Sequence, residues 1–262
     1  VVGRSSYAAV EHNPNINRCI LADDLGYGEI GAFGQQRIRT PNLDRLACQG
    51  ARLTNHYSGS AVCAPARCTL MLGKHTGHAT VRNNKEVGGW GPDEPEGQHP
   101  IPDEDRTIAE VLKERGYATA AIGKWGLGGP GSSGQPNRQG FDLFFGYLCQ
   151  RVAHNYYPTH LWRNDQRQDL RGNEWFSAHQ RFPEDDVPRD EAAYKRYSTS
   201  VYAPDPMIEA AEGFIDAHAH EPFFLYYPSL IPHLALQVPE TYVDAYPRSW
   251  DEAAYLGDHG YL

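Results

Sequence analysis

The sequence predicts an α/β fold built on a doubly wound, mostly parallel sheet with helices on both faces. Three short apolar segments are typical of buried strands, and ionisable side chains follow each of them closely. Segments with helical spacing alternate with these strands along the chain. Because the carboxyl ends of parallel strands meet at one edge of a sheet, we expect Asp23, Asp24, Lys124 and His233 to converge there.

Two helices are predicted from their end signals. Thr40 is the expected N-cap of the first, a proline follows it at the first helical position, and Gly50 ends the helix. Thr107 and Glu110 form the expected capping box of the second, which ends at Gly116. Both helices are interpreted as scaffold.

The remaining elements follow from apolar spacing. Strands are expected to end at Leu21 and to span 117–122 and 222–228, and a helix is expected over 205–220. The stretch 128–137 is rich in Gly, Ser and Pro, which predicts a loop.

The segment 61–78 contains the pattern Cys-x-Pro-x-Arg at Cys63, Pro65 and Arg67. Proline suits the first turn of a helix, so we expect a helix to begin near Pro65 with Cys63 just ahead of it. The free N–H groups and the positive end of the helix dipole would then lie close to Cys63. That environment stabilises an anion, either on the residue or on a substrate.

Three other interpretations of these residues stay open at this point. Cys63 could be an inert, buried thiol. Cys63, Cys68, His75 and His78 could bind zinc, although their spacing is tight for zinc modules. Cys63 and Cys68 could form a disulfide, which one helix would hold badly because the two side chains point to different faces.

Five segments of the chain, in order, resemble the formylglycine-dependent type I sulfatases of the alkaline-phosphatase superfamily. They are ILADDLGYG (20–28), RTPNLDRL (39–46), CAPARCTLMLGKH (63–75), GKWGLG (123–128) and PHLALQVP (232–239). The resemblance runs from about residue 14 to the end of the chain.

The resemblance implies that a formylglycine-generating enzyme oxidises Cys63 to formylglycine, whose hydrate carries two hydroxyl groups. It also implies one Ca²⁺ bound by Asp23, Asp24 and the residue at position 63, with Arg67 orienting the hydrate. From the residues alone, an ordinary solvated turn is the favoured interpretation of the two aspartates, and the resemblance reverses it. With the metal assigned, we expect loss of Asp23 to abolish calcium binding with little loss of fold, because adjacent carboxylates without a cation only repel.

The same resemblance implies that Lys124 and His233 bind the sulfate group, with His233 contacting it or protonating the leaving oxygen. Many family members carry histidine two residues after this lysine, whereas this chain has Gly126. His154 is our candidate for the missing imidazole and for substrate binding, and the residues alone favour the alternative of a hydrogen-bonded structural histidine. It begins a polar, aromatic stretch, 154–197, which we expect to be an irregular insertion lining a cleft.

The implied function is hydrolysis of an organic sulfate ester, either an aryl or a carbohydrate sulfate, to an alcohol and sulfate. A phosphonate or phosphodiester hydrolase of the same superfamily and a non-catalytic remnant are the alternatives. The net charge of −9 argues against a nucleic-acid partner, and no apolar run is long enough for a membrane span. The family resemblance implies a periplasmic or secreted protein.

Asp258 and His259 are similar to the pair that completes the calcium site in sulfatases. The stretch between His233 and Asp258 is too short for the long helix and the strand that the family places there. We therefore expect residues 1–262 to be the N-terminal portion of a sulfatase catalytic domain, without the rest of the domain and the small C-terminal subdomain. The remaining calcium ligands and a second sulfate-binding lysine would lie in those parts.

Overall fold

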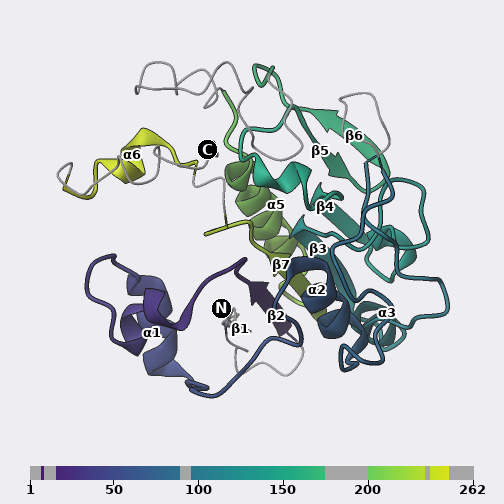
Figure 1. Ribbon diagram of the computed structural model, residues 1–262, viewed down its shortest axis with the longest axis horizontal. Helices are drawn as coiled ribbons and strands as arrows, with labels where there is room; N and C mark the ends of the chain where they lie inside the picture. Colours follow the sequence, from purple (N-terminus) through teal and green to yellow (C-terminus); the bar gives the residue numbers. More distant parts are fainter. Residues whose placement is uncertain (1–6, 9–15, 89–95, 175–199, 234–236, 248–262) are drawn as a thin grey trace.

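The computed structural model describes residues 7–8, 16–88, 96–174, 200–233 and 237–247. Their main feature is a seven-stranded sheet in the order β1-β2-β7-β3-β4-β5-β6 (Figure 1). The strands are β1 (Tyr7–Ala8), β2 (Ile16–Leu21), β3 (Ala118–Lys124), β4 (Leu143–Tyr147), β5 (His160–Arg163), β6 (Gln166–Asp169) and β7 (Phe223–Pro228). The central strands β2, β7, β3 and β4 are parallel, and the outer ones pair antiparallel.

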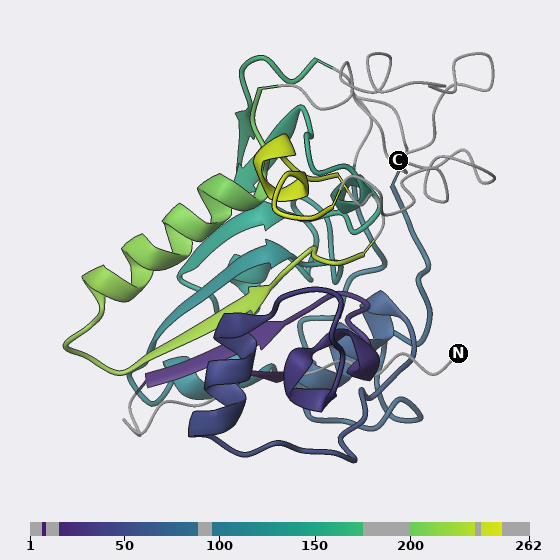
Figure 2. The same cartoon turned by 90° about the vertical axis from the view of Figure 1, so that its left-hand side faces the viewer.

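Helices cover both faces of this sheet, which confirms the predicted doubly wound fold. The helices are α1 (Pro41–Gln49), α2 (Cys63–Leu72), α3 (Ile108–Lys113), α5 (Pro204–Ala217) and α6 (Glu240–Val243). Short 3₁₀ turns are η1 (Tyr27–Glu29), η2 (Gly31–Phe33), η3 (Pro136–Arg138) and η4 (Val152–His154). Figure 2 shows α5 lying along one face of the sheet. Within the described residues, no helix combines the length and apolar character that crossing a bilayer requires.

Alternate residues of the central strand β7 enter two separate apolar layers. Phe223 and Leu225 pack in the layer that contains α5, whereas Phe224 and Tyr226 pack in the layer that contains α2 and α3. Successive side chains of a strand point to opposite faces, so a strand buried on both sides is apolar throughout. Each large side chain buried in this way contributes roughly 1.5–3 kcal/mol. The sheet is therefore held rigidly where its strand ends carry the polar residues.

The helix predictions are confirmed, with one difference in detail. The capping box of Thr107 and Glu110 is present at the start of α3. Thr40 and Gly50 flank α1 as expected, but the Thr40 hydroxyl accepts a hydrogen bond from the Gly31 N–H (2.8 Å) instead of capping the helix. This bond ties the start of α1 to η2, close behind the end of β2.

The prediction of an irregular insertion over 154–197 is wrong for its first part. β5 and β6 form a hairpin there, joined through Asn164, whose φ is +56°. The strand β6 is exposed along its whole length, so it lacks the alternating pattern on which the prediction depended. Asn164 and Asp165 are turn-forming residues, but they are not the Asn-Gly or Asp-Gly pair that marks a two-residue hairpin most strongly. Residues 175–197 of this stretch, and Asp258 and His259, lie outside the described residues.

Candidate active site

The reactive-site segment forms the first turn of α2. The helix begins at Cys63 itself, with Val62 as N-cap. The prediction that the helix begins near Pro65, with Cys63 just ahead of it, is therefore wrong by two residues. Pro65 is tolerated at the third helical position because N–H groups in the first turn have no partner within the helix. The Val62 side chain cannot cap, and the Asn84 side chain accepts the Ala64 N–H instead (3.0 Å). The contact of Asn84 with α2 was not predicted from the sequence, because Asn84 follows the helix in a separate loop.

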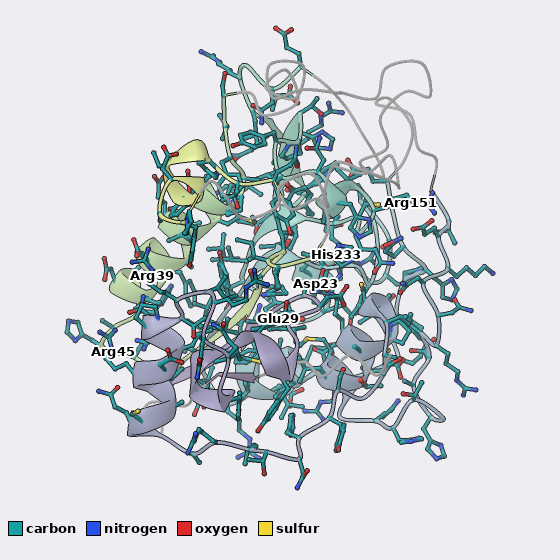
Figure 3. The ribbon with its side chains drawn as sticks, turned by 60° about the vertical axis from the view of Figure 1, so that its left-hand side comes forward. Asp23, Glu29, Arg39, Arg45, Arg151 and His233 are labelled. Carbon is teal, nitrogen blue, oxygen red and sulfur yellow. The ribbon has the colours of Figure 1, made fainter. Side chains whose placement is uncertain are left out.

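The structure brings together the strand-end residues that the sequence predicted. Asp23 follows β2, Lys124 is the last residue of β3, and His233 follows β7. Because β2, β7 and β3 are parallel neighbours, these ends meet at one edge of the sheet. Figure 3 shows Asp23 and His233 side by side. The N-terminus of α2 lies at the same place, since Arg67 contacts Asp23.

Asp23 is paired with two buried cations. Its Oδ2 lies 2.6 Å from Lys124 Nζ and its Oδ1 lies 3.2 Å from Arg67 Nη2. All three residues are buried. Burial raises the pKa of Asp23, but the charges of Lys124 and Arg67 outweigh it and hold the pKa well below its usual range. The repulsion between Asp23 and Asp24 is therefore offset by side chains of this chain, contrary to the expectation that only a metal would offset it.

Cys63 faces this ion-pair cluster. Lys124 Nζ donates to Cys63 Sγ over 3.6 Å, and the thiol is partly buried. Burial raises the pKa of Cys63, and the nearby charge of Lys124 only partly offsets this. The thiol is therefore protonated at neutral pH, and a thiol is a weaker nucleophile than a thiolate. Cys63 as it stands is not an activated nucleophile.

Two histidines complete the cluster. The rings of His154 and His233 are stacked, with centroids 4.3 Å apart and planes at 11°. His154 Nε2 lies 3.4 Å from Lys124 Nζ, and His233 Nε2 lies 3.4 Å from an Asp24 carboxylate oxygen. His154 therefore lies in one cluster with Lys124 and His233, and its role in place of the missing imidazole stays a prediction.

The site contains donor atoms that a metal ion could use. Asp23, Cys63 and His233 each offer a ligand atom, and these atoms lie within 4.8 Å of one another. Asp24 adds an exposed carboxylate beside His233. Ca²⁺ prefers oxygen ligands, so the two carboxylates fit it, and position 63 would fit once it carries oxygen in place of sulfur.

The zinc and disulfide interpretations are not supported. Cys68 is buried, its Sγ lies 3.8 Å from the Thr80 hydroxyl, and Cys63 and Cys68 are both free thiols. Among the described residues, the cluster with metal-ligand spacing does not include Cys68, His75 or His78.

Gly126 has a backbone conformation and close neighbours that disfavour the family's histidine. Its φ is +78°, and a Cβ there would lie 3.3 Å from both Cβ and Oε1 of Gln150. The same Cβ would lie 3.7 Å from Cδ of Arg67. The sequence showed that histidine is absent at this position, but it did not show that Gln150 lies against Gly126.

We predict that Gly126→His lowers the free energy of unfolding by roughly 2–4 kcal/mol, from backbone strain together with crowding. Gly131→His is a matched control, because Gly131 has a φ of +73° but open space around it. The control should lose about 1–2 kcal/mol from strain alone. Urea unfolding of both variants measures the difference. Equal losses of unfolding free energy would show that the Gln150 side chain moves aside at no energetic cost.

The fold and the site define an α/β protein with buried cationic side chains at the strand ends and a cysteine in the first turn of a helix. The family model described as Sulfatase matches residues 19–261. The chain therefore belongs to the sulfatase family, which confirms the resemblance seen in the sequence.

Individual relatives agree with this assignment. Human arylsulfatase A is 44% identical over 139 residues, covering 53% of this chain and 26% of the relative. Mouse arylsulfatase J is 31% identical over 233 residues, covering 87% of this chain and 34% of the relative.

Solved structures show the same fold. The Ps i-CgsB complex with k-i-k-neocarrahexaose has a TM-score of 0.66 and 25% identity, covering 93% of this chain and 51% of that one. The PsFucS1 sulfatase from Pseudoalteromonas sp. has a TM-score of 0.59 and 21% identity, covering 87% and 46%. The chain thus spans about half the length of these structures, and the matched part is a smaller share of the curated relatives.

Proposed function

We propose that the protein hydrolyses an organic sulfate ester at the site formed by Cys63, Arg67, Lys124, His154 and His233. The observation that carries this proposal is the position of Cys63 on the first turn of α2 and within reach of the buried Lys124 Nζ. Helix N–H groups and a fixed ammonium group together suit a tetrahedral anion such as sulfate. Membership of the sulfatase family supports the same reaction.

The residues of this chain have distinct parts in the proposed reaction. Lys124 Nζ is held between Asp23, Cys63 and His154, so its position is fixed before a substrate arrives. Arg67 anchors the first turn of α2 to the same carboxylate. His233 lies at the open side of the cluster, where it can contact the sulfate or give a proton to the leaving alcohol oxygen.

Two groups complete this site in the proposal, and the family supports both. Asp23, Asp24 and the oxygen at position 63 would hold one Ca²⁺, which draws in sulfate oxygens and lowers the pKa of the attacking hydroxyl. Formylglycine made from Cys63 would supply, as its hydrate, the attacking hydroxyl and a second hydroxyl that lets the sulfate leave. A formylglycine-generating enzyme is then a maturation partner, and a periplasmic or secreted location is proposed with it.

Because the remaining calcium ligands are expected outside residues 1–262, the test is turnover by the full-length protein made in a host that contains the maturation enzyme. Mass spectrometry of the peptide that spans Cys63 should show the aldehyde. The protein should hydrolyse 4-nitrophenyl sulfate faster than bis(4-nitrophenyl) phosphate or an aryl phosphonate. Faster turnover of a phosphorus ester would favour the phosphodiester or phosphonate alternative, and no turnover with converted Cys63 would indicate a non-catalytic remnant.

A further inference from the structure

The turn that carries His233 is held at both ends by one buried side chain. The His233 N–H donates to the Leu230 carbonyl oxygen (3.1 Å), which closes the turn shortly after β7. The Tyr156 hydroxyl lies 2.8 Å from the same Leu230 oxygen and is also within hydrogen-bonding distance of the His233 carbonyl oxygen. Its single proton can go to either oxygen, so the hydroxyl bridges the first and last residues of the turn.

Tyr156 is itself held firmly in the core. It is 2% exposed, its N–H donates to the Gln237 side-chain oxygen (2.6 Å), and its carbonyl accepts the Ala203 N–H (2.8 Å). Burial raises the pKa of Tyr156 well above its usual value, so the hydroxyl stays protonated and remains a donor. The turn is therefore fixed by a group whose own position is determined by backbone and side-chain contacts.

Tyr156 also links the two histidines of the site. It lies two residues after His154, and the rings of His154 and His233 are stacked with their centroids 4.3 Å apart. On its other side, the turn is tied to the end of β2, because the Asp23 N–H donates to the Ile231 carbonyl oxygen (3.2 Å). The position of the His233 imidazole thus depends on a turn that is held from two sides.

We propose that Tyr156 is a positioning residue that acts through His233, its hydroxyl holding the turn so that the imidazole stays stacked on His154. This inference rests on the proposed function, in which His233 contacts the sulfate or gives a proton to the leaving oxygen. A displacement of about 1 Å can cost roughly 100-fold in rate, so a residue that does not touch the substrate can still affect turnover. Tyr156→Phe keeps the buried ring and removes the contacts with both carbonyl oxygens.

Tyr147→Phe is the matched control. Tyr147 is also almost fully buried, and its hydroxyl donates to a backbone carbonyl, that of Asn155 (2.7 Å). Each substitution removes one buried hydroxyl, so the urea midpoints of the two variants should fall by similar amounts. Of the two, Tyr156→Phe is the one that removes a hydroxyl contact with the turn of His233.

Hydrogen exchange tests the hold on the turn without depending on turnover. Mass spectrometry measures exchange of the peptide that covers residues 229–233 in the full-length protein and in both variants. We expect this peptide to exchange about tenfold faster in Tyr156→Phe than in Tyr147→Phe, because loss of a hydrogen bond favours local opening. Equal exchange in the two variants would overturn the proposal.

Turnover of 4-nitrophenyl sulfate by the matured, full-length protein tests whether Tyr156 acts through His233. Tyr156→Phe should lower kcat about tenfold, and Tyr147→Phe should change it by less than about twofold. In a His233→Ala background, Tyr156→Phe should change kcat by less than about twofold, because the group that it positions is gone.

Three results of the turnover experiment would overturn the proposal. They are an unchanged kcat in Tyr156→Phe, an equal loss in Tyr147→Phe, and the same tenfold loss in the His233→Ala background, which would show a general effect on the fold. If the parent protein does not cleave the ester at all, the proposed function fails. Hydrogen exchange then decides separately whether Tyr156 holds the turn.

Discussion

Asp23→Asn is expected to lower the free energy of unfolding by roughly 3–5 kcal/mol, the cost typical of removing one partner from a buried ion pair. The variant keeps the shape of the side chain but leaves Lys124 and Arg67 without the carboxylate that both contact. Both cations are almost fully buried, so water cannot replace the lost charge. This outcome replaces the expectation from the sequence that Asp23 is dispensable for folding.

Asp24→Asn is the matched control for this experiment. The Asp24 side chain is 60% exposed, and asparagine tolerates its positive φ of +62°. Its loss should change the free energy of unfolding by no more than about 0.5 kcal/mol. Urea denaturation in chelator measures both variants without a bound metal. Similar losses in the two variants would show that the pairs with Lys124 and Arg67 contribute little.

Cys63→Ala is expected to abolish sulfate ester hydrolysis, with a fall in kcat on the order of 10⁴-fold or more, as is typical when a nucleophile is removed. The fold should be nearly unaffected, because the thiol is only partly buried and its contact with Lys124 is long. We expect the free energy of unfolding to change by less than about 1 kcal/mol.

Steady-state turnover of 4-nitrophenyl sulfate and urea unfolding measure the two effects of Cys63→Ala separately. Cys48→Ala is the control, because Cys48 is an exposed cysteine on α1. The control should retain full activity after the same expression and maturation. Substantial turnover by Cys63→Ala would place the nucleophile elsewhere and contradict the proposed mechanism.

The sequence was informative wherever a local pattern determined the structure. Apolar segments that end in ionisable residues predicted the convergence of Asp23, Lys124 and His233, because parallel strands share one edge. Helix ends were predicted from single caps such as Thr107. Strand β6 was not predicted, because an exposed edge strand has no apolar alternation.

Contacts between remote segments could not be predicted in this way. No local pattern indicates that Asn84 caps α2 or that Gln150 occupies the space above Gly126. The pairing of Asp23 with Lys124 and Arg67 also depends on the order of the strands, which one sequence does not fix. The sequence therefore predicted that Asp23, Lys124 and His233 lie together, whereas the ion pairs and hydrogen bonds around them came from the structure.

The place of β7 in the sheet has a consequence for protein synthesis. β7 lies between β2 and β3 in the sheet. Asp23 follows β2 and Lys124 ends β3, so the two residues are brought together only after β7 has been synthesised. Translation proceeds at about 5–20 residues per second, so roughly 10 to 30 seconds pass between synthesis of Cys63 and of Phe223. During that interval the nascent chain lacks the strand that closes the site. Cys63 is thus accessible to a modifying enzyme before the sheet that later encloses it has formed.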